Sequence, residues 1–76
     1  MTTQLIHLPT IERVQRFTAA MQEFDFEVDL TCGRYTVNGK SIMGILSLDL
    51  NQGITAQADP PAEAEERLLE VLGEFA

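Results

Sequence analysis

Hydrophobic side chains recur with two different spacings in the first third of the chain. Before Pro9, alternate residues point to opposite sides, with Gln4, Ile6 and Leu8 on one side, which predicts a strand over residues 3–8. Apolar positions then fall three or four residues apart, the spacing of one helix face: Ile11, Val14, Phe17, Thr18 and Met21. With Thr10 as N-cap, this spacing predicts an amphipathic helix over residues 10–23.

The stretch FEVDLTCGRYTVNG has the alternation of an antiparallel hairpin. Every second residue from Phe26 is apolar, and Gly33-Arg34 suits a two-residue turn, because glycine tolerates a positive φ. The turn sets three pairs with all six residues on one face: Cys32 with Tyr35, Leu30 with Val37, and Val28 with Gly39. Turn and hydrophobic pattern demand the same register, so we predict strands over residues 26–32 and 35–39 with one buried face.

Beyond the hairpin the apolar spacing changes twice. Six aliphatic residues follow Ser41 within nine positions, which favours a short helix over residues 41–49 with Ser41 as N-cap. Alternation then predicts a strand over 53–58, and Pro61 suits the first turn of a closing helix over 61–75. The order is β-α-β-β-α-β-α. Because each strand has one apolar and one polar face, we expect an α+β fold, a four-stranded antiparallel sheet with three helices on one face.

Composition narrows the class of protein. The chain has 76 residues, 45% hydrophobic and 22% charged, which fits a single globular domain over residues 1–76. Twelve acidic residues against five basic ones give a net charge of −7, which disfavours nucleic acid and membranes as partners. We expect neither a membrane span nor a signal peptide. The one cysteine, Cys32, fits a small core residue in a cytoplasmic protein.

The tripeptide Gly39-Lys40-Ser41 occurs in many phosphate-binding loops. Such a loop requires G-x-x-x-x-G-K-[ST], because backbone N–H groups must close around the phosphates. Here Arg34 occupies the place of the first glycine. The sequence therefore predicts no nucleotide site. The carboxylates of the closing helix lie on its wet side, and we expect no cofactor, no metal site and no enzymatic activity.

The residues that follow this glycine resemble a known family. The run KSIMGILSL, residues 40–48, resembles the segment of the phosphocarrier protein HPr, of the bacterial sugar phosphotransferase system, that carries its regulatory serine. The similarity runs back through the hairpin to Phe24 and forward through residues 52–54 and the last helix. The resemblance implies an HPr-like open-faced sandwich.

The phosphoryl-accepting motif of HPr is not matched. HPr carries a phosphoryl group on a histidine just before its first helix, in a Gly-x-His-x-Arg-Pro context, where the imidazole is the nucleophile and the arginine helps to hold the phosphate. The ungapped alignment puts Thr10, Glu12 and Arg13 at the histidine, arginine and proline positions. The segment before the helix is also shorter than in HPr. The resemblance thus implies an HPr-like protein without the usual phosphoryl acceptor.

His7, the only histidine, has two open interpretations. Its place shortly before Pro9 loosely resembles the histidine context of HPr, which makes His7 a candidate displaced phosphoryl acceptor. Strand alternation instead leaves His7 with Leu5 on the open face of the sheet, an ordinary exposed position. A metal-binding role would need ligands from outside the chain.

Ser41 is a helix cap and, by the resemblance, a candidate regulatory phosphorylation site. In the HPr family a dedicated kinase phosphorylates this serine, and the modified protein docks on a transcriptional regulator, so an HPr kinase is a candidate partner. From the helical spacing alone, we expect Ile42, Ile45 and Leu48 to face the core, with Met43 and Leu46 partly exposed. The partner-binding surface implied by the resemblance comprises Lys40, Ile42, Met43 and Leu46.

Two functional hypotheses follow. The first is a regulatory or scaffolding module that binds protein partners of the phosphotransferase or catabolite-regulation type. In it, Ser41 stands at the regulatory-serine position. The alternative is a working phosphocarrier that transfers a phosphoryl group through His7.

Overall fold

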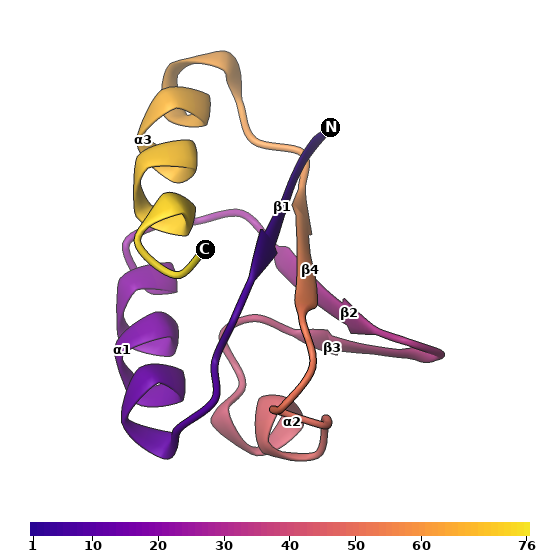
Figure 1. Ribbon diagram of the computed structural model, residues 1–76. Helices are drawn as coiled ribbons and strands as arrows, with labels where there is room; N and C mark the ends of the chain where they lie inside the picture. The colour runs from indigo at the N-terminus through magenta and orange to yellow at the C-terminus, as the bar shows by residue number, and fades with distance from the viewer.

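The four predicted strands form one antiparallel sheet in the computed structural model, which describes residues 1–76. The strands lie in the order β1-β4-β2-β3, so the last strand of the chain lies between the first and the second (Figure 1). The elements are β1 (Thr2–Ile6), α1 (Ile11–Met21), β2 (Val28–Cys32), β3 (Tyr35–Asn38), α2 (Ile42–Leu46), β4 (Ile54–Ala58) and α3 (Ala62–Gly73). The predicted α+β fold and element order are confirmed.

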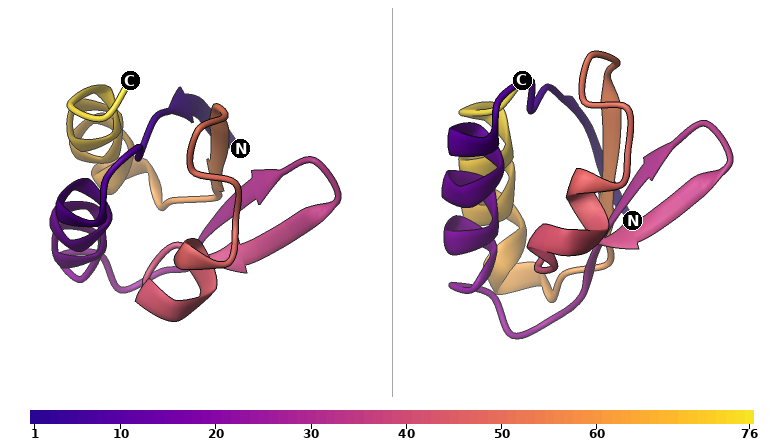
Figure 2. Two further views of the ribbon diagram at one scale, coloured as in Figure 1. Left: turned by 60° about the horizontal axis from the view of Figure 1, so that its bottom comes forward. Right: turned by 90° about the horizontal axis from the view of Figure 1, so that it is seen from below.

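The hairpin has the register that its turn and its hydrophobic pattern demanded together. Cys32 pairs with Tyr35 and Leu30 with Val37, and Gly33 has a φ of 61° in the turn. At the far end, the N–H of Gly39 donates to the carbonyl of Val28 at 2.6 Å, just beyond the ladder. The tip of the hairpin projects well past the rest of the molecule (Figure 2).

All three helices cover the same face of the sheet, with α1 and α3 side by side (Figures 1 and 2). Their apolar sides and the inner face of the sheet enclose one cluster of 18 buried hydrophobic residues. Within it, the rings of Phe17 in α1 and Phe75 after α3 meet edge to face, with centroids 5.2 Å apart. The other face of the sheet is open. None of the helices has the length and apolar character needed to cross a membrane.

Three side chains predicted to be buried are exposed instead. Ile11 is 60% exposed because it begins α1, beyond the edge of the core. Tyr35 is 70% exposed because it stands next to the projecting turn, where no helix covers the sheet. Ile42 is 41% exposed because α2 has only five residues, and Ile45 is the one that it buries.

Several element ends also differ from the prediction. β2 starts at Val28 rather than at residue 26, α2 ends at Leu46 rather than at 49, and α3 ends at Gly73 rather than at 75. β1 ends at Ile6 rather than at residue 8, because the N–H of His7 donates to the carbonyl of Phe75 at 2.7 Å instead of continuing the ladder. Pro61 is the N-cap of α3 rather than a residue of its first turn, with an extended ψ of 155°. Thr2, which the alternation did not include, is buried under α3 and donates its hydroxyl to Glu65.

Candidate functional site

A threonine, Thr10, caps the start of α1. The Thr10 hydroxyl oxygen accepts a hydrogen bond from the N–H of Arg13 at 3.2 Å, and Thr10 itself has the extended backbone of an N-cap. Glu12 lies in the first turn, where a negative charge is favourable. The position at which the alignment with HPr expects a histidine therefore holds a helix cap.

His7 lies just past the end of β1 with an exposed imidazole. Its ring lies beside Gly53, because a Cβ added to that glycine would stand 3.4 Å from the His7 Nε2 and 2.9 Å from the Leu5 Cδ1. His7 therefore shares the open face with Leu5, as the alternation predicted. No side chain or backbone group forms a hydrogen bond with its imidazole.

Arg13 contacts the backbone of His7. The Arg13 Nε donates to the His7 carbonyl at 3.1 Å, and the guanidinium lies over the ring of Phe75, 5.4 Å from its centroid. A cation thus stands next to the histidine, held by the hydrogen bond and by cation–π attraction.

Ser41 caps α2, as predicted. Its Oγ accepts from the N–H of Gly44 at 3.1 Å, and its own N–H donates to the carbonyl of Asn38 at 3.0 Å. The residue is half-buried. Because Oγ is the acceptor in the cap, that hydrogen bond does not use the O–H proton of Ser41.

The lysine of the Gly39-Lys40-Ser41 tripeptide points back into the molecule. The Lys40 Nζ donates to the carbonyl of Phe24, three residues past the end of α1, at 2.5 Å. Its backbone N–H donates to the Asn38 Oδ1 at 2.8 Å. Lys40 was expected at the partner-binding surface, but its ammonium already ties α2 to the end of α1. The sequence pattern contains no signal for this bond, because the acceptor is a backbone carbonyl.

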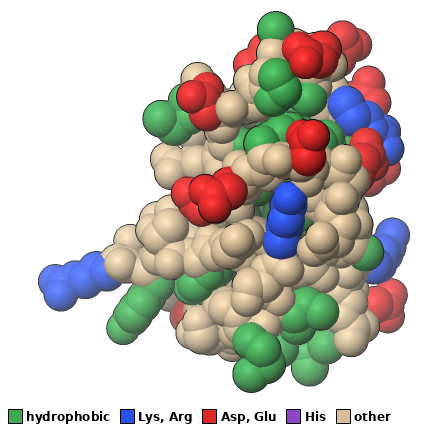
Figure 3. Space-filling view, turned by 180° about the vertical axis from the view of Figure 1, so that it is seen from behind, with side chains coloured by type: hydrophobic (Ala, Val, Ile, Leu, Met, Phe, Trp, Pro, Cys, Tyr) green, Lys and Arg blue, Asp and Glu red, His purple; other side chains and the backbone are tan.

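The outward side of α2 is apolar. Met43 is 80% exposed, while Ile42 and Leu46 are exposed to a smaller extent, and the opposite side of the helix buries Ile45. Figure 3 shows hydrophobic side chains gathered at the lower end of the molecule, the end at which α2 lies in Figure 1. We call Ile42, Met43 and Leu46 the α2 patch. An exposed group of this kind is typical of a surface that contacts another protein.

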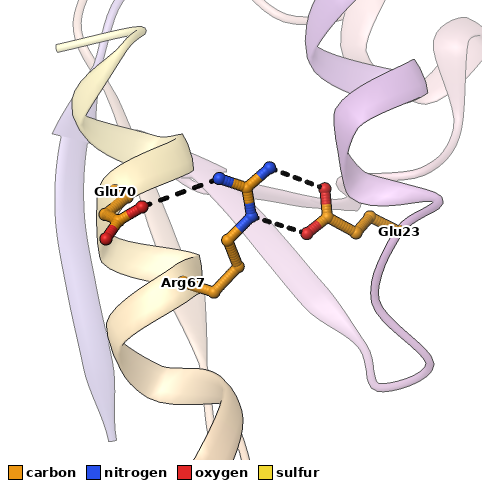
Figure 4. A network of polar contacts seen from close by, with 3 residues as sticks. All are labelled: Glu23, Arg67 and Glu70. Carbon is orange, nitrogen blue, oxygen red and sulfur yellow. Dashed lines mark hydrogen bonds and ion pairs between the residues drawn. The ribbon is translucent and has the colours of Figure 1, made fainter.

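An ion-pair network joins α3 to the residues just after α1, away from the α2 patch (Figure 4). Arg67 in α3 binds both carboxylate oxygens of Glu23, at 2.7 and 3.2 Å, and lies 3.6 Å from Glu70. The hydrogen bond from Arg67 lowers the pKa of Glu23, and the same bond raises the pKa of Arg67. This network adjoins neither His7 nor Ser41. Two hollows indent the surface, and neither is lined by either residue.

Comparison with known proteins identifies the family. The family model described as "PTS HPr component phosphorylation site" matches residues 13–76, so the matched part begins after His7 and Thr10. No curated protein matches the chain.

Two solved structures have the same fold. One is HPr-C-His from Thermoanaerobacter tengcongensis, with a TM-score of 0.81 and 23% identity over 97% of this chain and 89% of that one. The other is the phosphocarrier protein HPr from Bacillus anthracis str. Ames, with a TM-score of 0.79 and 24% identity over 99% and 96%. With its family model matched from residue 13 to the last residue, the chain belongs to the HPr family of the phosphotransferase system.

Proposed function

We propose that this chain is a regulatory or scaffolding module that binds protein partners through the α2 patch, with Ser41 as its phosphorylation site. One juxtaposition carries the proposal: a serine hydroxyl with a free proton caps the same short helix that exposes Met43. At the start of α1, by contrast, Thr10 takes the place of the family's phosphoryl histidine.

Phosphorylation of Ser41 would change the character of this surface. Transfer of the γ-phosphoryl group from ATP to Oγ, with loss of the hydroxyl proton, adds about −1.5 to −2 charge next to the α2 patch. A partner that binds the apolar side chains must then also accommodate a dianion. Since Lys40 is bonded to Phe24, it is not free to neutralise the phosphate without breaking that bond. Partners that bring their own cations should therefore bind the phosphorylated form. Partners without such cations should bind the unmodified form.

The first test is phosphorylation itself. We expect an HPr kinase with ATP to add one phosphate, measured by intact mass, and Ser41→Ala to abolish the addition. Ser41→Asn is the sharper variant, because asparagine retains an N-cap acceptor but has no hydroxyl to modify. Ser47→Ala is the control, since Ser47 lies at the other end of α2 with its hydroxyl bonded to Gly44. Absence of any mass gain with a kinase that modifies authentic HPr would leave Ser41 as a cap alone.

The same assay tests docking on the α2 patch. We expect Met43→Glu to lower the kcat/KM of the kinase about tenfold, the loss of one good interface contact. Leu69→Glu places the same charge on an exposed leucine of α3 and should leave kcat/KM unchanged. Equal effects of the two variants would contradict docking at α2.

His7 supports a second candidate function, phosphoryl transfer. The observation in its favour is an exposed imidazole without a hydrogen-bond partner, beside the Arg13 guanidinium. Against it, that guanidinium is bonded to the His7 carbonyl and stacked on Phe75 rather than free to hold a phosphate.

We expect phosphoenolpyruvate and enzyme I, the general phosphotransferase, to leave no acid-labile phosphate on this chain. The assay runs on the Ser41→Ala variant, so that phosphoserine cannot contribute, with authentic HPr as positive control. Stoichiometric phosphohistidine that His7→Ala removes would make phosphoryl transfer the function.

A further inference from the structure

The outer edge of β3 is an unprotected boundary of the sheet. In a two-residue hairpin the residues that flank the turn form a hydrogen-bonded pair, and bonded pairs recur at every second position. Tyr35 and Val37 therefore bond to β2, and the bond from Gly39 to Val28 continues the series. The backbone groups of Thr36 and Asn38 point away from the sheet. Ser41 takes up the carbonyl of Asn38, which leaves both groups of Thr36 and the N–H of Asn38 without a partner in the chain.

The opposite edge of the sheet is partly closed. At β1, the N–H of His7 donates to Phe75, and the Gln4 side chain donates to the carbonyl of Leu5 at 3.0 Å. Sheets commonly protect an edge with charge or proline, but the β3 sequence YTVN has neither, although 17 of the 76 residues are charged. The β3 edge therefore has unpaired backbone groups, two β-branched side chains and no charged side chain.

The side chains of β3 also suit a strand partner. Thr36 stands on the open face, where its hydroxyl is 3.3 Å from that of Thr31, while Val37 packs toward Gly44 of α2 on the other side. Tyr35 lies on the same side as Val37 but is 70% exposed. Figure 3 shows the hairpin tip projecting from the body with a long cationic side chain at its end; the residues of this turn are Gly33 and Arg34. Tyr35 thus leaves an exposed aromatic ring beside the unpaired strand edge.

We propose that the β3 edge binds a second copy of this chain, which joins the two sheets into one of eight strands. With the two-fold axis at Thr36, each Thr36 donates its N–H to the Thr36 carbonyl of the other copy and accepts the reciprocal bond. The same register places Tyr35 of one copy beside Val37 of the other, on the helix side. It also places the N–H of Asn38 against the carbonyl of Arg34. The strand is thus self-complementary, as a two-fold interface requires.

Charge favours this edge over the rest of the surface. Each copy carries a net charge of −7, yet the segment from Cys32 to Gly39 contains one charge, the cation of Arg34. The two copies meet where neither is acidic, and the repulsion between the remaining surfaces makes association stronger at higher salt. A four-residue strand buries far less than the roughly 1,200 Å² of a stable interface, so the dimer is weak and forms at high protein concentration.

Tyr35 makes the test specific, because the chain has one tyrosine and no tryptophan. Sedimentation equilibrium should show a mass that rises above 8.5 kDa as the concentration approaches about 1 mM, with tyrosine emission becoming harder to quench by acrylamide in parallel. Amide proton shifts should concentrate on Thr36 and Asn38. Thr36→Pro removes the outward N–H, and Thr36→Glu places two carboxylates face to face at the two-fold axis. Each should weaken association at least tenfold.

Thr31→Glu is the matched control. It adds the same charge to the same face and removes the same hydroxyl contact, but on an interior strand, so it should retain association. Circular dichroism checks that each variant is folded, and Thr36→Glu decides the matter if proline disrupts the hairpin. A chain that is monomeric at every concentration and salt overturns the proposal. So does a dimer whose amide shifts fall on β1, or one abolished by Met43→Glu and not by Thr36→Glu.

Discussion

At the scale of single residues, two glycines of this chain have opposite surroundings. Gly39 is buried at the end of the hairpin, where an added Cβ would stand 2.9 Å from the carbonyl oxygen of Val28. That oxygen also accepts the hydrogen bond from Gly39, so neither backbone can retreat without losing it. Gly73 ends α3 with no atom within 4 Å of an added Cβ. The fold requires a glycine at position 39, but it does not require one at position 73.

We therefore expect Gly39→Ala to destabilise the protein by about 1–3 kcal/mol, the usual cost of forcing an extra methyl group into a packed site. Gly73→Ala is the matched control and should be neutral or stabilising by up to about 1 kcal/mol, because alanine loses less backbone entropy in a helix. Urea unfolding followed by circular dichroism measures both. Equal stabilities of the two variants would mean that Val28 moves aside without cost.

Residues also show where sequence reasoning succeeds and where it fails. Thr10 and Ser41 were predictable as caps because capping depends on groups within three positions along the chain. The exposure of Tyr35 was not, because alternation reports which face a side chain takes and not how far the neighbouring helices extend. The predicted burial of Ile42 was wrong for a similar reason, because it depended on the length of α2. The hydrogen bond from Lys40 to the Phe24 carbonyl joins groups 16 positions apart. It could not be predicted from the sequence, because every residue has a backbone carbonyl.

At the scale of elements, the contact between α1 and α3 has a polar clamp on its surface. Arg67 binds Glu23 with two bonds, and the hydrogen bond holds the pKa of Glu23 below its usual value. A carboxyl group whose pKa is lower in the folded than in the unfolded state stabilises the fold above the unfolded pKa. That contribution is lost as the pH falls through the folded pKa. Both side chains are largely exposed, so solvent screens the pair and the effect is small.

We expect Glu23→Gln to lower the urea midpoint slightly at pH 7 and to have no effect at a pH well below about 4, where the native carboxyl is also protonated. Added salt should shrink the difference at pH 7. Glu66→Gln removes the same charge from an exposed position of α3 without breaking an ion pair, and it corrects for the change in net charge. A deficit of Glu23→Gln that persists undiminished in acid would show that packing, and not ionisation, is responsible.

At the scale of the whole molecule, the net charge of −7 opposes compactness. Salt screens this repulsion, but it also weakens the three ion pairs that the structure contains, all of them exposed. Twelve acidic groups outnumber five basic ones, and exposed pairs contribute little, so relief of repulsion should dominate.

The melting temperature should consequently rise by a few degrees between low salt and about 0.2 M sodium chloride, where the Debye length falls below about 10 Å. Thermal unfolding followed by circular dichroism measures it, at a dilution at which the chain is monomeric, so that self-association does not contribute. A melting temperature that falls over this range would show that the ion pairs outweigh the net repulsion.

The order β1-β4-β2-β3 has a consequence for the making of the protein on a ribosome. β1 leaves the ribosome first, yet its sheet partner is β4, whose residues emerge about fifty positions later. The hairpin of β2 and β3 can close as soon as it is synthesised, because its contacts are local. β1 instead has no sheet neighbour until Ala58 is outside the exit tunnel, and contacts of such long sequence separation form slowly. Between the emergence of the hairpin and that of β4 the nascent chain thus holds a finished hairpin and an unpaired strand, and β4, an interior strand, joins the sheet last.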